Sequence, residues 1–154
     1  MLRLIGVGNR WRADDGAGLL VAKLIARRRP AGIEVICHSG EPIELIGELA
    51  DAGAVWLIDA VRSGAAPAGT VHRFDASEHP LPATLFRTST HHIGLADTLE
   101  LGRALHRLPE QVLVFGIEGA RFETGAPLSA PVAAAAAELA LALIEEASAC
   151  VATP

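Results

Sequence analysis

Near its amino terminus the chain reads LRLIGVGNRWRADDGAG, residues 2–18. Residues 2–8 are a short apolar run that ends in glycine, which is typical of a strand buried on both faces of a sheet. Asp14 and Asp15 follow where a helix is expected to begin. Apolar residues then repeat at helical spacing as far as Pro30, at Ala17, Leu20, Val21, Leu24 and Ile25. We therefore predict a central strand, a glycine turn and an amphipathic helix.

The same alternation of strand and helix patterns continues along the chain. Apolar runs predict strands over residues 33–37, 54–58, 70–75 and 111–117, and helical patterns predict helices over 42–50, from 91 or 92 to about 106, and from 130 to about 147. Because the connection between 58 and 70 is too short for a parallel crossover, we expect those two strands to form an antiparallel pair. The pattern predicts an α/β fold, a three-layer αβα sandwich with a mixed, mostly parallel sheet of about five strands, in one domain over residues 1–154.

Composition excludes several classes of protein. Hydrophobic residues make up 51% of the 154 residues and charged residues 20%, which excludes a disordered chain. A net charge of −5 gives no case for binding nucleic acid. Residues 132–144, the longest apolar tract, are too short for a bilayer span of roughly 20 residues, and residues 1–6 lack the features of a signal peptide. We expect a cytoplasmic protein with no membrane contact.

The cysteines form no disulfide framework and no zinc-binding spacing, because Cys37 and Cys150 are the only two. We interpret Cys37 as a small buried hydrophobe. Familiar catalytic signatures are missing as well. Trp11 stands where a dinucleotide-binding loop needs its third glycine, and there is no Walker lysine, no HExxH helix and no G-x-S-x-G elbow.

Two acids fall where ligands bind in an open α/β sheet, outside the carboxyl ends of the parallel strands. Asp15 follows the first predicted strand and Asp59 follows the third. His91, which opens a predicted helix, could face the same crevice. Two carboxylates and an imidazole can hold a divalent cation and leave coordination positions open for a substrate.

Plainer interpretations of these and other residues stay open. Asp14 and Asp15 would be ordinary acids at a helix amino terminus, and one of His91 and His92 would cap a helix while the other packs or is solvated. Asp59 must find a partner, because it directly follows an apolar strand. Trp11 is either an anchor for a partner or a cover over the core. The remaining histidines, His38, His72, His79 and His106, are interpreted as structural or exposed.

Three segments, taken in order, resemble one family. They are GVGN with DDGAG at residues 6–9 and 14–18, LIDA at 57–60, and STHHIGL at 89–95. Together they are similar to the hydrogenase maturation proteases, the endopeptidases of [NiFe]-hydrogenase assembly, and the similarity extends from Met1 to about Ala147.

The resemblance implies an endopeptidase that removes a C-terminal extension from a hydrogenase large-subunit precursor once nickel has been inserted. It carries the metal-contacting and catalytic roles to Asp15, Asp59 and His91, with His92 as the alternative histidine. Nickel would arrive with the substrate rather than stay bound as a cofactor, and the protein would act as a monomer. The turn at residues 38–42, HSGEP, departs from the Gly-Gly-Thr type of many relatives, and we expect this change to affect which precursor fits.

Two alternative functions belong to other classes of protein. One is a binding or chaperone-like module that recognises a hydrogenase subunit without cutting it. The other is a peptidyl-tRNA hydrolase, which also begins with a strand and a Gly-x-Gly-Asn turn, although the net charge of −5 argues against a tRNA substrate.

Overall fold

The computed structural model describes residues 1–86 and 93–152. Its elements, in chain order, are β1 (Leu2–Val7), the short 3₁₀ helix η1 (Ala13–Gly16), α1 (Ala17–Arg28), β2 (Ile33–His38), α2 (Pro42–Ala50), β3 (Ala54–Val61), β4 (Val71–Asp75), α3 (Leu95–Ala104), β5 (Gln111–Glu118) and α4 (Ala130–Val151).

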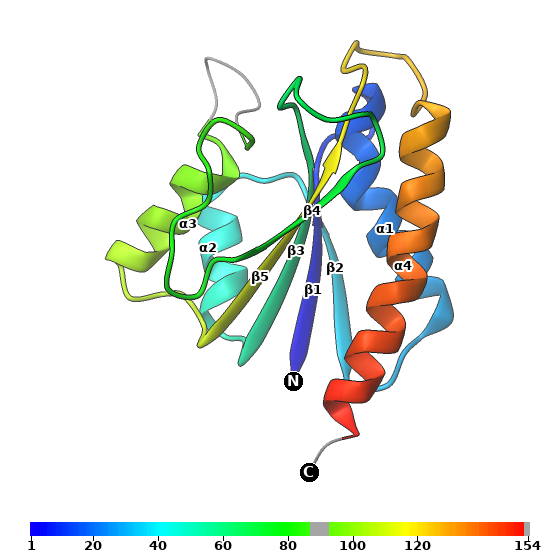
Figure 1. Ribbon diagram of the computed structural model, residues 1–154. Helices are drawn as coiled ribbons and strands as arrows, with labels where there is room; N and C mark the ends of the chain where they lie inside the picture. Colours follow the sequence, from blue (N-terminus) through cyan, green and yellow to red (C-terminus); the bar gives the residue numbers. More distant parts are fainter. Residues whose placement is uncertain (87–92, 153–154) are drawn as a thin grey trace.

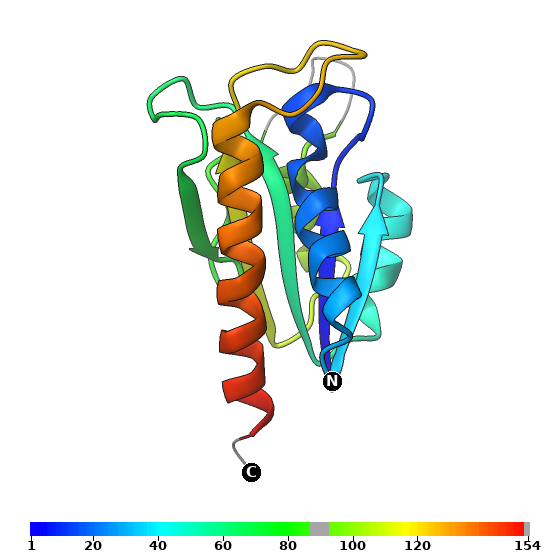
Figure 2. The same ribbon diagram turned by 90° about the vertical axis from the view of Figure 1, so that its right-hand side faces the viewer.

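The strands form one sheet in the order β2-β1-β3-β5-β4. The first four of these run parallel, and β4 at the edge is antiparallel to β5. Helices α1 and α4 cover one face of the sheet, and α2 and α3 cover the other (Figures 1 and 2). The predicted three-layer αβα sandwich with a mixed, mostly parallel sheet is confirmed.

The central strands are buried on both faces because their apolar residues are nearly continuous. In β3, Trp56 and Ile58 pack in the core beneath α1 and α4, while Val55 and Leu57 pack in the core beneath α2 and α3. This alternation follows from the two-residue period of a strand. Asp59 therefore lies on the α2 and α3 side, one residue beyond Ile58.

The prediction that strand 70–75 pairs with strand 54–58 is wrong. β4 is antiparallel, but it pairs with β5, with Val71 opposite Ile117 and Asp75 opposite Leu113. The edge of β3 that β4 was expected to occupy is already taken by β5 over its whole length, from Ala54 opposite Gln111 to Val61 opposite Glu118. The same pairing carries β3 two residues past Asp59, where we expected it to stop.

Helix α3 starts later than predicted. Gly94, which has an extended backbone, is the N-cap residue of α3. The carbonyl oxygen of Gly94 accepts hydrogen bonds from the backbone N–H and the hydroxyl of Thr98, both at 3.0 Å. The predicted start at His91 or His92 lies outside the described residues. The helix ends at Ala104, before His106, which has a left-handed backbone with φ of 56°. Helix α4 runs to Val151, a few residues further than expected.

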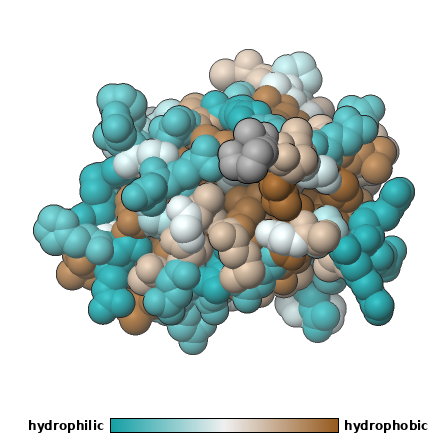
Figure 3. All heavy atoms as spheres, turned by 90° about the horizontal axis from the view of Figure 1, so that it is seen from below, coloured by the Kyte–Doolittle hydropathy of each residue, from teal (hydrophilic) through white to brown (hydrophobic). Residues whose placement is uncertain are grey.

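Cys37 is exposed, so its interpretation as a buried hydrophobe is wrong. The physical reason is that β2 is an edge strand, which packs on only one neighbouring strand. Seen from the amino-terminal ends of the strands, hydrophilic side chains gather toward the outline with hydrophobic ones between them (Figure 3). Within the described part of the chain, no helix is both long and apolar enough to cross a bilayer.

Candidate functional site

The cavity that contains the two predicted acids lies between β1 and β3, where the order in which the chain adds strands to the sheet reverses. From β1 the chain crosses to β2 on one side, and β3 lies on the other side of β1. Connections on opposite faces leave a crevice outside the carboxyl ends of β1 and β3, where open α/β sheets bind ligands. A cavity of about 370 Å³ opens there, and its described lining consists of Val7, Gly8, Asn9, Arg12, Asp15, Ser39, Gly40, Glu41, Pro42, Leu45, Asp59, Ile93, Gly94 and Leu95.

Asp59 reaches this cavity from β3. The pairing of β1 with β3 ends at Gly6 and Ile58, so Asp59 is the next residue and has no β1 residue beside it. Its side chain is only 2% exposed. Among the described residues its carboxyl accepts one hydrogen bond, from the backbone N–H of Ala60 at 2.8 Å. Burial, together with the nearby negative charge of Asp15, raises the pKa of Asp59 to about 8.

Asp15 reaches the same cavity from η1. Its Oδ2 accepts a hydrogen bond from the backbone N–H of Asn9 at 3.1 Å. The turn is tight, because a side chain at Gly8 would lie 2.0 Å from the carbonyl oxygen of Asp15. Burial raises the pKa of Asp15, while the charge of Arg12 and the hydrogen bond from Asn9 partly oppose the rise.

Glycine also brings α1 close to the sheet. A Cβ atom at Gly18 would lie 2.2 Å from the carbonyl oxygen of Ile58, so only glycine allows this approach of the helix to β3. Because α1 directly follows η1, this contact places Asp15 beside the end of β3. Gly18, the second glycine of the DDGAG motif, therefore helps to bring the two acids together.

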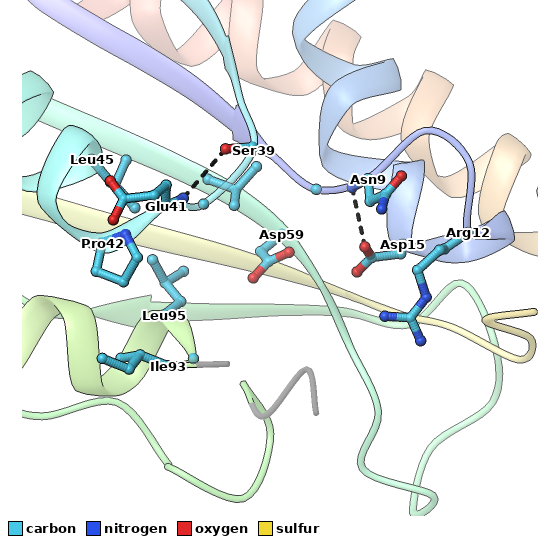
Figure 4. Close-up of a pocket in the computed structure, with 14 residues that line it drawn as sticks. Asn9, Arg12, Asp15, Ser39, Glu41, Pro42, Leu45, Asp59, Ile93 and Leu95 are labelled. Atoms are coloured by element: carbon cyan, nitrogen blue, oxygen red, sulfur yellow. Dashed lines mark hydrogen bonds between the residues drawn. The ribbon is translucent and has the colours of Figure 1, made fainter. Parts of the chain in front are cut away.

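The two predicted aspartates thus come together in one cavity, with their carboxyl groups facing the same open space (Figure 4). His91 and His92 lie outside the described residues, although Ile93, Gly94 and Leu95 line the cavity. Within residues 1–86 and 93–152 no group of three histidine, cysteine or acidic side chains is arranged to hold a metal. The described part of the site is a pair of buried carboxyl groups able to supply oxygen ligands or to exchange a proton.

Asp14 has a different role from its neighbour Asp15, and this role was not predicted from the sequence. It is fully buried, and its carboxylate accepts hydrogen bonds from the backbone N–H groups of Ala120, Arg121 and Ser129 at 2.7 to 3.0 Å. Burial acts to raise the pKa of Asp14, but these hydrogen bonds outweigh it, so the pKa lies below its usual value. Asp14 therefore joins the turn after β1 to the loop after β5, and it is no ordinary acid at a helix terminus.

Ser129 directly precedes α4, but its side chain does not cap the helix. Its hydroxyl donates to Asp14 instead. No local sequence pattern could predict the contact between Asp14 and Ser129, because the two residues are 115 positions apart.

A model of the family described as "Hydrogenase maturation protease", HycI, matches residues 19–146. The chain belongs to the hydrogenase maturation protease family. The matched segment includes Asp59 and begins after Asp15. The hydrogenase expression/formation protein HupM of Azotobacter chroococcum mcd 1 is 31% identical over 134 residues, which cover 85% of this chain and 64% of that protein. The chain thus spans less than two thirds of that relative.

Two solved structures have a similar fold. An endopeptidase from Escherichia coli, solved in solution, is 27% identical and superposes with a TM-score of 0.75, covering 96% of this chain and 94% of that one. The crystal structure of the [NiFe] hydrogenase maturation protease HycI from Thermococcus kodakarensis KOD1 has a TM-score of 0.73 at 20% identity, covering 94% and 90%, and shows the fold alone.

In this member of the maturation protease family, the HSGEP turn at residues 38–42 lines the cavity through Ser39, Gly40 and Glu41. His38 accepts a hydrogen bond from the backbone N–H of Gly40 at 2.9 Å, so it is structural, as predicted. Glu41 accepts a hydrogen bond from the backbone N–H of Glu44 and caps α2.

The structure also shows the surroundings of Trp11 and of His72, two residues interpreted from the sequence. Trp11 is 63% exposed, so it does not cover the core, and the guanidinium of Arg10 lies 4.4 Å from its ring centroid. Glu118 ends β5, one residue beyond the predicted strand, and is buried. It accepts hydrogen bonds from the backbone N–H and hydroxyl of Ser63, and His72 lies 3.3 Å away. His72 is therefore structural.

Proposed function

We propose that this chain is an endopeptidase that removes the C-terminal extension of a [NiFe]-hydrogenase large-subunit precursor after nickel has been inserted. The observation that carries the proposal is the meeting of two buried carboxyl groups, Asp15 and Asp59, in one cavity at the carboxyl ends of β1 and β3. Membership of a family described as maturation proteases supports peptide-bond hydrolysis as the reaction.

Nickel, in this proposal, is cargo of the substrate. Asp15, Asp59 and His91 complete its coordination, with carboxylate oxygens and an imidazole nitrogen as ligands of suitable type. The chemistry of Asp59 fits, because only its Oδ1 accepts a hydrogen bond among the described residues. Within residues 1–86 and 93–152 its other carboxyl oxygen accepts no hydrogen bond, so it can bind a cation.

The raised pKa of Asp59, about 8, means that this carboxyl is largely protonated at neutral pH before substrate binds. A cation that binds the carboxylate must displace this proton. Precursor without nickel supplies no such cation and leaves Asp59 in its neutral form. The acid pair thereby provides a physical basis for distinguishing nickel-loaded from nickel-free precursor.

Hydrolysis adds the oxygen of a water molecule to the scissile carbonyl carbon, breaks the C–N bond and returns a proton to the leaving amine. The carboxylates serve this reaction in one of two ways. In one, an ionised aspartate accepts the proton of the attacking water. In the other, the aspartates act only by holding the metal-bearing segment, so that the scissile bond is positioned for attack.

The test is to incubate the purified protein with nickel-loaded and nickel-free precursor from the same organism and to follow the precursor's mass. We expect cleavage of the loaded form only. Asp15→Asn and Asp59→Asn should each abolish cleavage, whereas Asp51→Asn, an exposed acid at the end of α2, should not. Equal cleavage of both precursors contradicts recognition of nickel, and a stable complex of unchanged mass supports the binding module instead.

The charges of the cavity give no support to a tRNA substrate. Its described lining has one cationic side chain, Arg12, beside the acids Asp15, Glu41 and Asp59. A monomeric state and a cytoplasmic location stay predictions of the proposed function.

A further inference from the structure

Arg12 lines the cavity from the turn between β1 and η1. Its backbone is held at several points. Its N–H donates to the carbonyl oxygen of Asn9 at 3.2 Å, its carbonyl oxygen accepts from the N–H of Asp15 at 3.0 Å, and Gly125 donates to the carbonyl oxygen of Trp11 at 2.8 Å. The turn therefore presents the Arg12 side chain to the cavity from a fixed backbone.

The guanidinium of Arg12 has no hydrogen-bond partner and no carboxylate within 4.0 Å in the described part of the chain. Other arginines are engaged. Arg73 forms a paired contact with Glu146, and Arg103 donates to backbone carbonyl oxygens of the loop after β4. Figure 4 shows Arg12 reaching into the cavity near Asp15. Its five N–H donors are thus available to a ligand.

A cation at this position does not help to hold a metal ion, because it repels one. It is suited to a carboxylate, which a guanidinium binds through two parallel hydrogen bonds. A peptide that enters the cavity with its metal toward Asp15 and Asp59 would bring neighbouring groups within reach of Arg12.

We propose that Arg12 is a specificity-determining residue that binds a carboxylate of the precursor's C-terminal segment. The inference rests on the proposed function, since it names a feature of the same substrate. The carboxylate belongs either to an acidic side chain near the scissile bond or to the chain terminus. Arg12 fixes the register of the segment and takes no part in bond breaking.

The first experiment compares steady-state cleavage of nickel-loaded precursor by the wild-type protein, Arg12→Ala, Arg12→Lys and Arg10→Ala. Loss of a charge-assisted hydrogen-bonded pair should raise KM about 10- to 100-fold in Arg12→Ala while kcat changes less than about twofold. Arg12→Lys should recover part of the loss. Arg10→Ala, which removes an equal charge that lies against the Trp11 ring, should leave KM within about twofold of the wild-type value.

The second experiment changes the precursor. Each acid of its C-terminal segment is replaced singly by Asn or Gln, and in a separate arm two glycines are added at the end to displace the terminal carboxylate. With the wild-type protein, one of these changed precursors should show a KM raised as much as Arg12→Ala raises it for the unchanged precursor. With the Arg12→Ala protein, the same changed precursor should show no further rise in KM. That arm identifies the source of the carboxylate.

Several results would overturn the inference. They are an Arg12→Ala protein that behaves like Arg10→Ala, a loss confined to kcat, or effects of Arg12→Ala that add to those of every precursor change. Circular dichroism and a thermal melt of each variant exclude unfolding as the cause. If the wild-type protein leaves nickel-loaded precursor intact, the proposed function itself fails, whereas cleavage without coupling to Arg12 contradicts only this inference.

Discussion

The carboxylate of Asp14 accepts a hydrogen bond from the backbone N–H of Ser129, 2.7 Å away and 115 residues further along the chain. Its neighbour Asp15 instead points into the cavity that also contains Asp59. Two adjacent acids thus have separate roles, one holding the loops at the top of the sheet and one available to a ligand. Mutations can distinguish these roles.

Replacing Asp14 should destabilise the fold. Asp14→Asn puts an amide N–H₂ where the carboxylate accepts from backbone donors, so at least one buried N–H loses its partner. We expect the free energy of unfolding at pH 7 to fall by about 2–3 kcal/mol. Urea denaturation measures the change, with the exposed Asp51→Asn as a control that should stay within about 0.5 kcal/mol of the wild type.

Acid should reduce the effect of the Asp14 substitution. The pKa of Asp14 is lower in the folded protein than its usual value, so its contribution to stability is present above about pH 4 and is lost as the pH falls through the folded pKa. The difference between wild type and Asp14→Asn should therefore shrink on acidification. A difference that stays constant down to pH 2 would contradict this account.

Asp59 should give the opposite pH dependence. Its folded pKa of about 8 lies above the unfolded value of about 3.9, so the folded protein binds more protons between these pH values and the free energy of unfolding falls as pH rises toward 8. Asp59→Asn cannot ionise. The metal-free variant should therefore be more stable than wild type at pH 8 to 9, with a smaller difference near pH 5, in denaturant titrations. A variant that is less stable than wild type at pH 9 would be inconsistent with a pKa of Asp59 raised by burial and by Asp15.

Gly18→Ala should separate α1 from β3. The added Cβ would lie 2.2 Å from the carbonyl oxygen of Ile58, so the helix must shift, at a cost of about 1–3 kcal/mol, and Asp15 moves with it. Cleavage of precursor should fall as well. Gly47→Ala is the matched control, because Gly47 lies in α2 with open space around its Cβ position. It should raise stability by about 0.5–1 kcal/mol in a thermal or denaturant melt, and a similar gain at Gly18 would contradict the close approach.

The histidine assignment is tested by two single variants. In the proposed function His91 is a ligand to nickel, so His91→Ala should lower the rate of precursor cleavage by more than the 10- to 100-fold that loss of an outer partner of a metal ligand typically causes. His92→Ala should retain cleavage. Mass spectrometry of the precursor over time measures both rates, and an active His91→Ala beside an inactive His92→Ala would move the role to His92.

Local sequence patterns were sufficient for β1, α1 and the alternation of strands and helices, because strand burial and helix amphipathicity repeat with short periods along the chain. The ends of elements were less predictable. β3 continues past Asp59 because β5 continues beside it, and α3 begins at Leu95 because Gly94 is extended. These boundaries depend on a neighbouring strand or on one backbone conformation.

The period of burial along the sequence is enough to predict the fold class and to bring Asp15 and Asp59 to one edge of a parallel sheet, because the carboxyl ends of parallel strands share an edge. The three-dimensional structure is needed to see that β4 pairs with β5, that Cys37 is exposed and that the Asp14 carboxylate accepts a hydrogen bond from Ser129. These facts depend on the order of strands and on contacts between residues far apart in the chain. A local pattern carries no information about either, because it records the period of burial and not the identity of the partner.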